Sequence, residues 1–507
     1  MTDTGIRVAN LLSDADPPQT LPSPNTPYEV AAMFMEQKHY TATMERTLYW
    51  WRNTWMIWRG SYWQELTRTS LRAQLYHFTA AATYINTEGD HKAWAPTERK
   101  INDLIGALAS LCELSDTIDA PCWLDGRKTG MTIATANGLL DVASRQLCPH
   151  TPQFFNLHAV PFAYDAAAGE PKQWFAFLDS VWPSRDAVAT HPAQDLLQEW
   201  FGYVLSGRTD FQKMMLLNGP TRGGRGTIGR VLTGLLGKEN VAGLRLNDLS
   251  ENFGMAHLIG KPLAIVGDER FSGRKMSEVV SALLMITGED PIPVNRKKRD
   301  RWNGKLPTRL MLFSNELQKL SDTSTAIIGR FLVLRMTESW LGREDIGLLD
   351  RLLGELPGIL NWGLEGLDWL VTNGKFTEDP GAAEIVAQLT ALASPMRTYV
   401  EENCVVGVGK DFEMNTQRLY HDHCAWRRAN GHMAIAGNTF GASLRAAFPH
   451  ITVRKTRRRP DGSQFRVYAG IRLKQPRDAL LGDNILPYRP RQQDAQRDEQ
   501  EPDPRPA

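Results

Sequence analysis

The sequence lacks the features that mark membrane, secreted and metal-stabilised proteins. No apolar run reaches the roughly 18 residues that a membrane-spanning helix needs. The N-terminus, MTDTGIRVANLLSDADPPQT, has neither the basic start nor the apolar centre of a secretory signal. The five cysteines are scattered and form no C-x-x-C pair, so neither a structural zinc site nor a disulfide framework is expected. We therefore expect a cytoplasmic protein with no membrane partner.

The chain also has almost no net charge. Its 58 Lys and Arg residues against 57 Asp and Glu residues leave a formal charge of +1, so any nucleic-acid surface must be local. A hydrophobic content of 42% is ordinary for a globular protein. The 507 residues suggest two to four domains, at about 150 residues per domain.

A glycine-rich stretch from Leu216 to Gly237, LLNGPTRGGRGTIGRVLTGLLG, is the most informative part of the chain. An apolar strand, a glycine loop and an amphipathic helix in this order form a device for binding polyphosphate, because loop amides and the positive end of the helix dipole face the anion. The spacing of Gly219 and Gly224 fits the P-loop pattern, but Arg225 stands where that pattern has Lys, and Thr227 comes one residue late. The residues expected to bind the nucleotide are Gly219, Pro220, Thr221, Arg222, Gly223, Gly224, Arg225, Gly226 and Thr227.

Two further apolar segments end in polar side chains. Leu263 to Val266 predicts a strand that leads to Asp268 and Glu269, a pair that could help to hold Mg²⁺ and orient an attacking water. LPTRLMLFSN predicts a strand that ends at Asn315, an amide suited to sensing the γ-phosphate. Arg330 precedes another apolar strand and is either a surface arginine or a finger that reaches a neighbour's nucleotide.

Basic residues gather in two predicted hairpins. Arg296, Lys297 and Lys298 lie between two strand-like pieces and form either a solvated turn or a contact with a phosphate backbone. Two predicted helices near the C-terminus precede a hairpin around Asp461-Gly462, an order typical of a winged helix. The residues of this hairpin expected to bind DNA are Arg454, Lys455, Arg457, Arg458 and Arg459.

The N-terminal part reads as mostly helical. Its stretch ERTLYWWRNTWMIWRGSYWQEL carries five tryptophans, which we expect to form the core of a small helical domain rather than a platform for stacked bases.

In this order, the motifs resemble the superfamily 3 helicases. FGMAHLIGKPLAIVGDER, LMITGED, LFSNELQKLSD and ELPGILNWGLEGL look most like the phage and plasmid primase-helicase branch, which includes the poxvirus-type primase-helicases. The resemblance covers about residues 45–473 and implies an AAA+-like α/β core that assembles into a hexameric ring, with ATP and Mg²⁺ as cofactors. It makes Asp268 and Glu269 the Walker B acids, Asn315 the sensor and Arg330 the finger, with Thr227 and Asp268 holding the metal.

The resemblance implies an ATP-dependent helicase that translocates on single-stranded DNA, opens forked DNA and replicates a phage, prophage or plasmid in a bacterial host cytoplasm. No primase site is evident, so a separate primase is a candidate partner. The alternative is an ATP-binding replication-initiation module with weak hydrolysis; the basic hairpins argue against a small-molecule phosphotransferase. The expected division is 1–28 disordered, 29–165 a helical or mixed domain, 166–342 the α/β ATPase core, 343–399 a helical subdomain, 400–473 a winged-helix domain and 474–507 a disordered tail.

Overall fold

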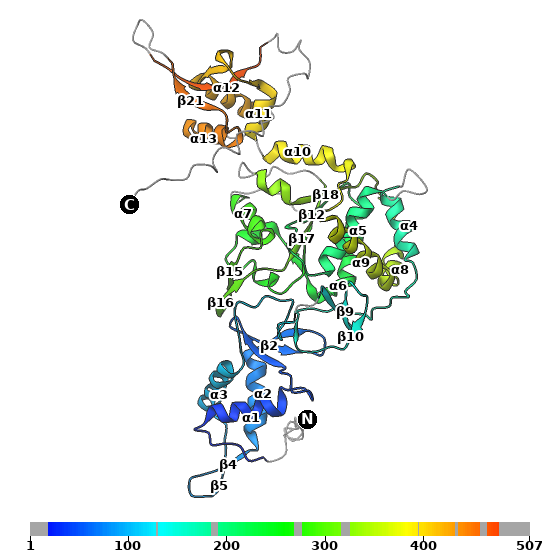
Figure 1. The fold of residues 1–507 in the computed structure, drawn as a ribbon, viewed down its shortest axis with the longest axis vertical. Helices are drawn as coiled ribbons and strands as arrows, with labels where there is room; N and C mark the ends of the chain where they lie inside the picture. Colours follow the sequence, from blue (N-terminus) through cyan, green and yellow to red (C-terminus); the bar gives the residue numbers. More distant parts are fainter. Residues whose placement is uncertain are drawn as a thin grey trace, which may run out of the picture. The chain divides into compact units, whose positions relative to one another are not determined.

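The protein is a mixed α/β structure, analysed in a computed structural model (Figure 1). The structure describes residues 19–127, 130–183, 191–267, 276–315, 325–393, 395–430, 434–456 and 464–475. The chain divides into two compact units, Met1–Leu389 and Thr390–Ala507. Within the described residues, no helix has the length and apolar character to cross a lipid bilayer.

The first unit begins with three helices around a small sheet. The helices are α1 (Pro27–Lys38), α2 (Arg68–Ala80) and α3 (Glu98–Leu111). The sheet has the order β3-β2-β1-β6 and consists of β1 (Leu48–Trp51), β2 (Thr54–Trp58), β3 (Trp63–Leu66) and β6 (Glu113–Leu114). A separate ribbon joins β4 (Thr83–Ile85) to β5 (His91–Ala93).

The tryptophan-rich stretch forms strands, so the expectation of helix there is wrong. Arg52 and Asn53 both have positive φ and make the tight turn between β1 and β2. Trp and Tyr suit a pleated, half-buried surface, which here outweighs their fit to a helix. Trp51, Trp55 and Trp63 are buried, as the core interpretation predicts.

Burial of His39 at the end of α1 makes this region sensitive to acid. The side chain is 4% exposed, its ring lies 4.9 Å from that of Phe34, and burial lowers its pKa from 6.5 to about 4. Since the unfolded chain binds a proton near pH 6.5 and the folded chain only near pH 4, this histidine's contribution to stability falls as the pH drops between these values.

We expect acidification from pH 7.5 to 5 to cost about 2 kcal/mol at His39 alone. His39→Gln should therefore lose less of its thermal midpoint than the parent protein over this pH range, followed by circular dichroism. His77→Gln, on the exposed side of α2, is the matched control and should follow the parent. An unchanged pH dependence in His39→Gln would contradict the assignment.

Short strands link this region to the core. They are β7 (Cys122–Trp123), β8 (Thr132–Thr135), β9 (Gly138–Asp141), β10 (Leu147–Cys148) and β11 (Phe154–Phe155). Asn137-Gly138, a pair that favours tight turns, lies in the hairpin of β8 and β9, which pair antiparallel with Thr135 opposite Gly138.

A five-stranded parallel sheet forms the centre of the first unit. Its order is β13-β14-β17-β12-β18, from β12 (Met214–Asn218), β13 (Val241–Leu244), β14 (Leu263–Val266), β17 (Arg309–Ser314) and β18 (Phe331–Arg335). Since all five strands are parallel, their carboxyl ends share one edge. An antiparallel hairpin of β15 (Ile292–Arg296) and β16 (Arg299–Gly304) lies beside the sheet; we call it the basic hairpin.

Helices flank this sheet, with α7 on one side and α5, α6 and α9 on the other in Figure 1. Their bounds are α4 (Lys172–Val181), α5 (Pro192–Leu205), α6 (Arg225–Leu236), α7 (Met276–Thr287), α8 (Leu348–Leu353) and α9 (Leu356–Asn373). α5 and α9 pack closely because Gly202 faces Gly363: a Cβ at Gly202 would collide with the carbonyl oxygen of Gly363.

The second unit combines helices with a small sheet. α10 (Ala383–Ala393) crosses from the first unit, and α11 (Pro395–Asn403), α12 (Thr416–Ala429) and α13 (Gly437–Ala447) follow. The sheet has the order β20-β22-β21, from β20 (Glu413–Asn415), β21 (Thr452–Lys455) and β22 (Arg466–Ala469), while β19 (Cys404–Val406) pairs with β23 (Ile471–Leu473). Two helices followed by a hairpin agree with the order that the sequence predicts; the winged-helix assignment stays a prediction.

Candidate functional site

The glycine loop joins the end of β12 to the start of α6. Gly224 caps the helix with φ +96°, a left-handed conformation that glycine adopts without steric cost. The amide of Gly219 donates to the Ser314 carbonyl (3.1 Å), and that of Gly223 donates to the Pro220 carbonyl (3.1 Å). Helix α6 therefore begins directly behind the loop, and its first-turn amides, those of Arg225 and Gly226 included, face the loop.

Arg225 turns inward rather than toward solvent. Its side chain is buried at 5% exposure, and Nη2 donates to the Pro220 carbonyl (3.3 Å) and to Asn315 Oδ1. Asn315 in turn lies 3.5 Å from Thr221 Oγ1 through its own amide nitrogen. The structure thus brings together Arg225 and Asn315, which are 90 residues apart in the sequence, because β12 and β17 are adjacent parallel strands.

A segment after β18, from Ser339 to Glu344, also contacts the glycine loop. The sequence alone does not predict this contact. Ser339 Oγ donates to the Thr221 carbonyl (2.8 Å), and the Trp340 amide donates to the Arg222 carbonyl (3.1 Å). Arg222 also pairs with Glu344 at 3.5 Å. No local pattern in the sequence marks these contacts, since they depend on how β18 leaves the sheet.

The expected metal ligands are only partly visible. Thr227, in the first turn of α6, is half-buried and lies within 3.5 Å of Arg230 Nη2. Asp268 and Glu269 follow β14 but lie outside the described residues. Among the residues that are described, no group of three or more His, Cys, Asp or Glu side chains could hold a metal ion.

Arg330 lies at the opposite edge of the sheet from the glycine loop. It precedes β18, whose five residues extend about 16 Å at 3.3 Å per residue, and it contacts Gln212 before the start of β12. The structure therefore does not bring Arg330 to the loop of its own chain.

The three predicted contacts of the basic hairpin have different surroundings. Lys297 and Lys298 are exposed at the turn, where Lys298 has φ +58°. Arg296 is half-buried instead: its Nη1 donates to Thr54 Oγ1 (2.9 Å), and burial lowers the pKa of its guanidinium.

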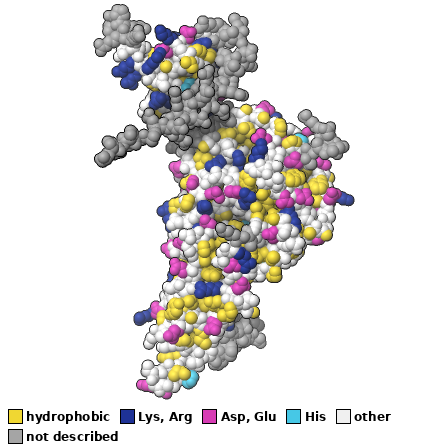
Figure 2. Space-filling view, in the orientation of Figure 1, with side chains coloured by type: hydrophobic (Ala, Val, Ile, Leu, Met, Phe, Trp, Pro, Cys, Tyr) yellow, Lys and Arg dark blue, Asp and Glu magenta, His cyan; other side chains and the backbone are white. Residues whose placement is uncertain are grey.

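Basic side chains outnumber acidic ones in the second unit. Its described residues 395–475 contain eleven Lys and Arg against five Asp and Glu, and dark-blue side chains gather on the face seen in Figure 2. Arg454 and Lys455 lie exposed on β21, at the edge of the sheet, although Arg454 pairs with Glu413. Arg457, Arg458 and Arg459 lie outside the described residues.

Two known families match successive parts of the first unit. Residues 51–183 match the family described as "D5 N terminal like". Residues 217–330 match a "Family of unknown function (DUF5906)", a range that runs from the end of β12 through the glycine loop to Arg330. The D5 N-terminal-like segment thus precedes the segment with every residue that we predict for nucleotide chemistry.

Solved structures give a weaker likeness. An A-form apo structure of the NrS-1 C-terminal region matches with 12% identity and a TM-score of 0.45, covering 83% of this chain and 96% of that one. A second apo structure of the same region matches with 14% identity and a TM-score of 0.43, covering 83% and 95%.

Proposed function

We propose that the chain is an ATP-dependent DNA helicase that replicates a phage, prophage or plasmid, working as a ring on single-stranded DNA. The contact between Arg225 and Asn315 carries the proposal. The contact places the Arg225 cation and the Asn315 amide at one edge of the sheet, where a polyphosphate would meet the first turn of α6. The D5 N-terminal-like match supports the same conclusion, because it agrees with the primase-helicase resemblance of the motifs.

Each predicted site residue would have its own role in ATP binding and hydrolysis. The amides of α6 and the Arg225 guanidinium would bind the phosphates of ATP, and Thr227 and Asp268 would hold Mg²⁺, which neutralises phosphate charge. Glu269 would orient the attacking water, and Asn315 would contact the γ-phosphate. Arg330, remote from the loop of its own chain, would reach the site of the next copy in the ring.

DNA would meet two basic surfaces. Lys297 and Lys298 present two exposed cations at the turn of the basic hairpin. The second unit adds the exposed Arg454 and Lys455, to which the charge of the predicted hairpin adds Arg457, Arg458 and Arg459.

An ATP-binding replication-initiation module with weak hydrolysis is the second candidate, and the burial of Arg225 favours it. A guanidinium already bonded to Pro220 and Asn315 must exchange these contacts for phosphate oxygens before it can act on the nucleotide. Such an exchange would favour nucleotide binding over nucleotide hydrolysis.

Turnover and strand displacement distinguish these two candidates. For the purified full chain, we expect ATP hydrolysis to rise on addition of single-stranded DNA and a forked duplex to be opened. An Asp268→Asn, Glu269→Gln double variant should bind nucleotide but lose turnover by at least about 100-fold, since removing a group that acts in the transition state has this magnitude. Nucleotide binding with turnover that ignores DNA, and no duplex opened, would reject the helicase and leave the initiation module. Full turnover in the double variant would refute the assignment of the two acids.

A further inference from the structure

The D5 N-terminal-like segment holds the basic hairpin at the two residues that flank its turn. On β15, Arg296 Nη1 donates to Thr54 Oγ1 of β2 (2.9 Å). On β16, Arg299 pairs with Glu65 of β3. Because these partners lie more than 200 residues apart in the sequence, the contacts are tertiary and join the two parts of the first unit.

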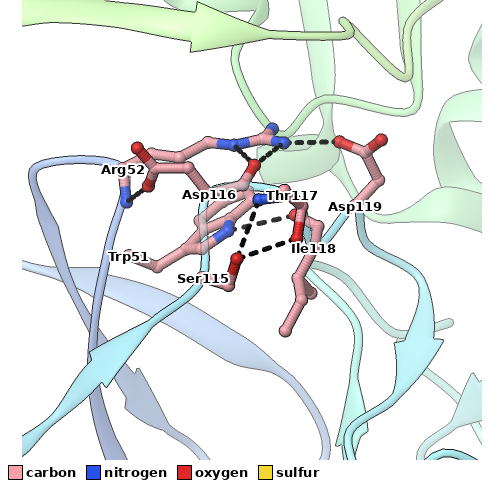
Figure 3. A network of polar contacts seen from close by, with 7 residues as sticks. All are labelled: Trp51, Arg52, Ser115, Asp116, Thr117, Ile118 and Asp119. Carbon is pink, nitrogen blue, oxygen red and sulfur yellow. Dashed lines mark hydrogen bonds and ion pairs between the residues drawn. The ribbon is translucent and has the colours of Figure 1, made fainter.

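Arg52 makes the central contact of this group. From the turn between β1 and β2, its guanidinium donates twice to the Asp116 carbonyl (3.1 and 2.7 Å) and pairs with Asp119 (2.6 Å), as Figure 3 shows. The same group lies 4.6 Å from the Trp51 ring centroid and 5.5 Å from that of Trp302 on β16, both within cation–π range.

Gly304, the last residue of β16, fits this arrangement. A Cβ at this position would collide with the guanidinium of Arg52, so the absence of a side chain lets Arg52 lie against the backbone of the hairpin. Trp302 and Gly304 therefore provide two separate contacts between Arg52 and the hairpin, in addition to the contacts that Arg52 makes within its own segment.

The residues around this contact are packed less densely than those of a hydrophobic core. Cavities of about 330 and 380 Å³ flank it, and both are lined by Trp51 and Trp302. Arg296 Nη2 is buried and has no hydrogen-bond partner among the described residues. Ile292 and Val294 of β15 are buried and keep the hairpin packed, so losing one polar or aromatic contact should loosen it without unfolding the sheet.

We propose that Arg52 is a positioning residue that anchors the basic hairpin and so sets how well Lys297 and Lys298 engage DNA. The anchor holds the hairpin in one orientation before DNA arrives, so the DNA does not have to order it. The consequence for DNA rests on the proposed function, whereas the anchoring itself does not.

Hydrogen exchange tests the anchor without reference to activity. In the full chain, Arg52→Met should raise exchange in peptides that cover residues 292–304, while exchange in β21 and β22 stays at the parent level. Gly304→Ala, which displaces the guanidinium from the other side, should produce the same pattern. Arg59→Met is the matched control: this exposed arginine follows β2, bonds to Gln64 in its own segment and should leave the hairpin unchanged. Unchanged exchange at 292–304 in both Arg52→Met and Gly304→Ala would overturn the proposal.

Stimulation by DNA tests the consequence. With single-stranded oligonucleotide as the probe, Arg52→Met should need three- to tenfold more DNA for half-maximal stimulation, with basal turnover unchanged, and Arg52→Lys should lie between it and the parent because an ammonium keeps the charge but loses the planar fork. A looser hairpin with an unchanged DNA requirement would refute the positioning role. If even the parent protein shows no stimulation, the proposed function fails, while the exchange result still decides the anchor.

Discussion

Arg225→Ala should lower ATP turnover about 10²- to 10³-fold, the loss that follows removal of one donor that stabilises developing charge. The side chain is buried below the glycine loop and joins Pro220 to Asn315, so the alanine variant loses both the cation and the bond between the loop and β17. Arg225→Lys should retain activity, because an ammonium at this position is what the P-loop pattern uses. Steady-state turnover, with nucleotide binding measured separately, checks the expectation.

Two controls separate catalysis from packing. Lys238→Ala removes an exposed cation just beyond the other end of the same helix and should keep turnover close to that of the parent. Asn315→Ala removes the partner of Arg225 but leaves the charge of Arg225 in place. The nucleotide affinity of this variant should therefore fall less than that of Arg225→Ala. Turnover in Arg225→Ala equal to that of the parent would make the side chain a bystander.

Arg330→Ala should lower turnover by about 10³-fold while nucleotide binding persists, since an arginine finger acts on transition-state charge. Its position before β18, across the sheet from the loop, means that a catalytic role needs a second copy of the chain. The decisive measurement is made on a mixture. When equal amounts of Arg330→Ala and Arg225→Ala are combined, about a quarter of the head-to-tail contacts pair an intact loop with an intact Arg330, so activity should partly return.

The mixture distinguishes a finger from a structural arginine. If Arg330 acts only within its own chain, for instance by holding Gln212 at the start of β12, the mixture stays as inactive as its components. Gln212→Ala provides the control for that contact and should remain active in the absence of any mixing.

The sequence predicted the central sheet better than the region before it. The apolar runs at Met214–Asn218, Leu263–Val266 and Arg309–Ser314 are strands, because their length and their polar ends are local signals. The tryptophan-rich stretch forms strands where its residues predict a helix, because its turn at Arg52-Asn53 has positive φ without the usual glycine.

Contacts between distant segments could not be predicted at all. Arg52 beneath Trp302 and Trp340 beside the glycine loop depend on how whole elements pack, and neither pair has a spacing that a sequence pattern could reveal. The inward turn of Arg225 is of the same kind, because only the adjacency of β12 and β17 brings Asn315 within its reach. The acids Asp268 and Glu269 remain predictions from the residues alone.

The glycine contact between α5 and α9 sets where the chain can be shortened. α5 buries eleven of its fourteen residues, and its Gly202 accepts the backbone of Gly363 with no side chain between them. A fragment ending at residue 342, after the last strand of the sheet, would remove α9. The apolar face of α5 would then be exposed to solvent, and the fragment would tend to aggregate. The shortest usable expression fragment that carries the central sheet therefore extends past Asn373, the last residue of α9, to Thr377, whose amide and hydroxyl donate to the buried Glu199 of α5.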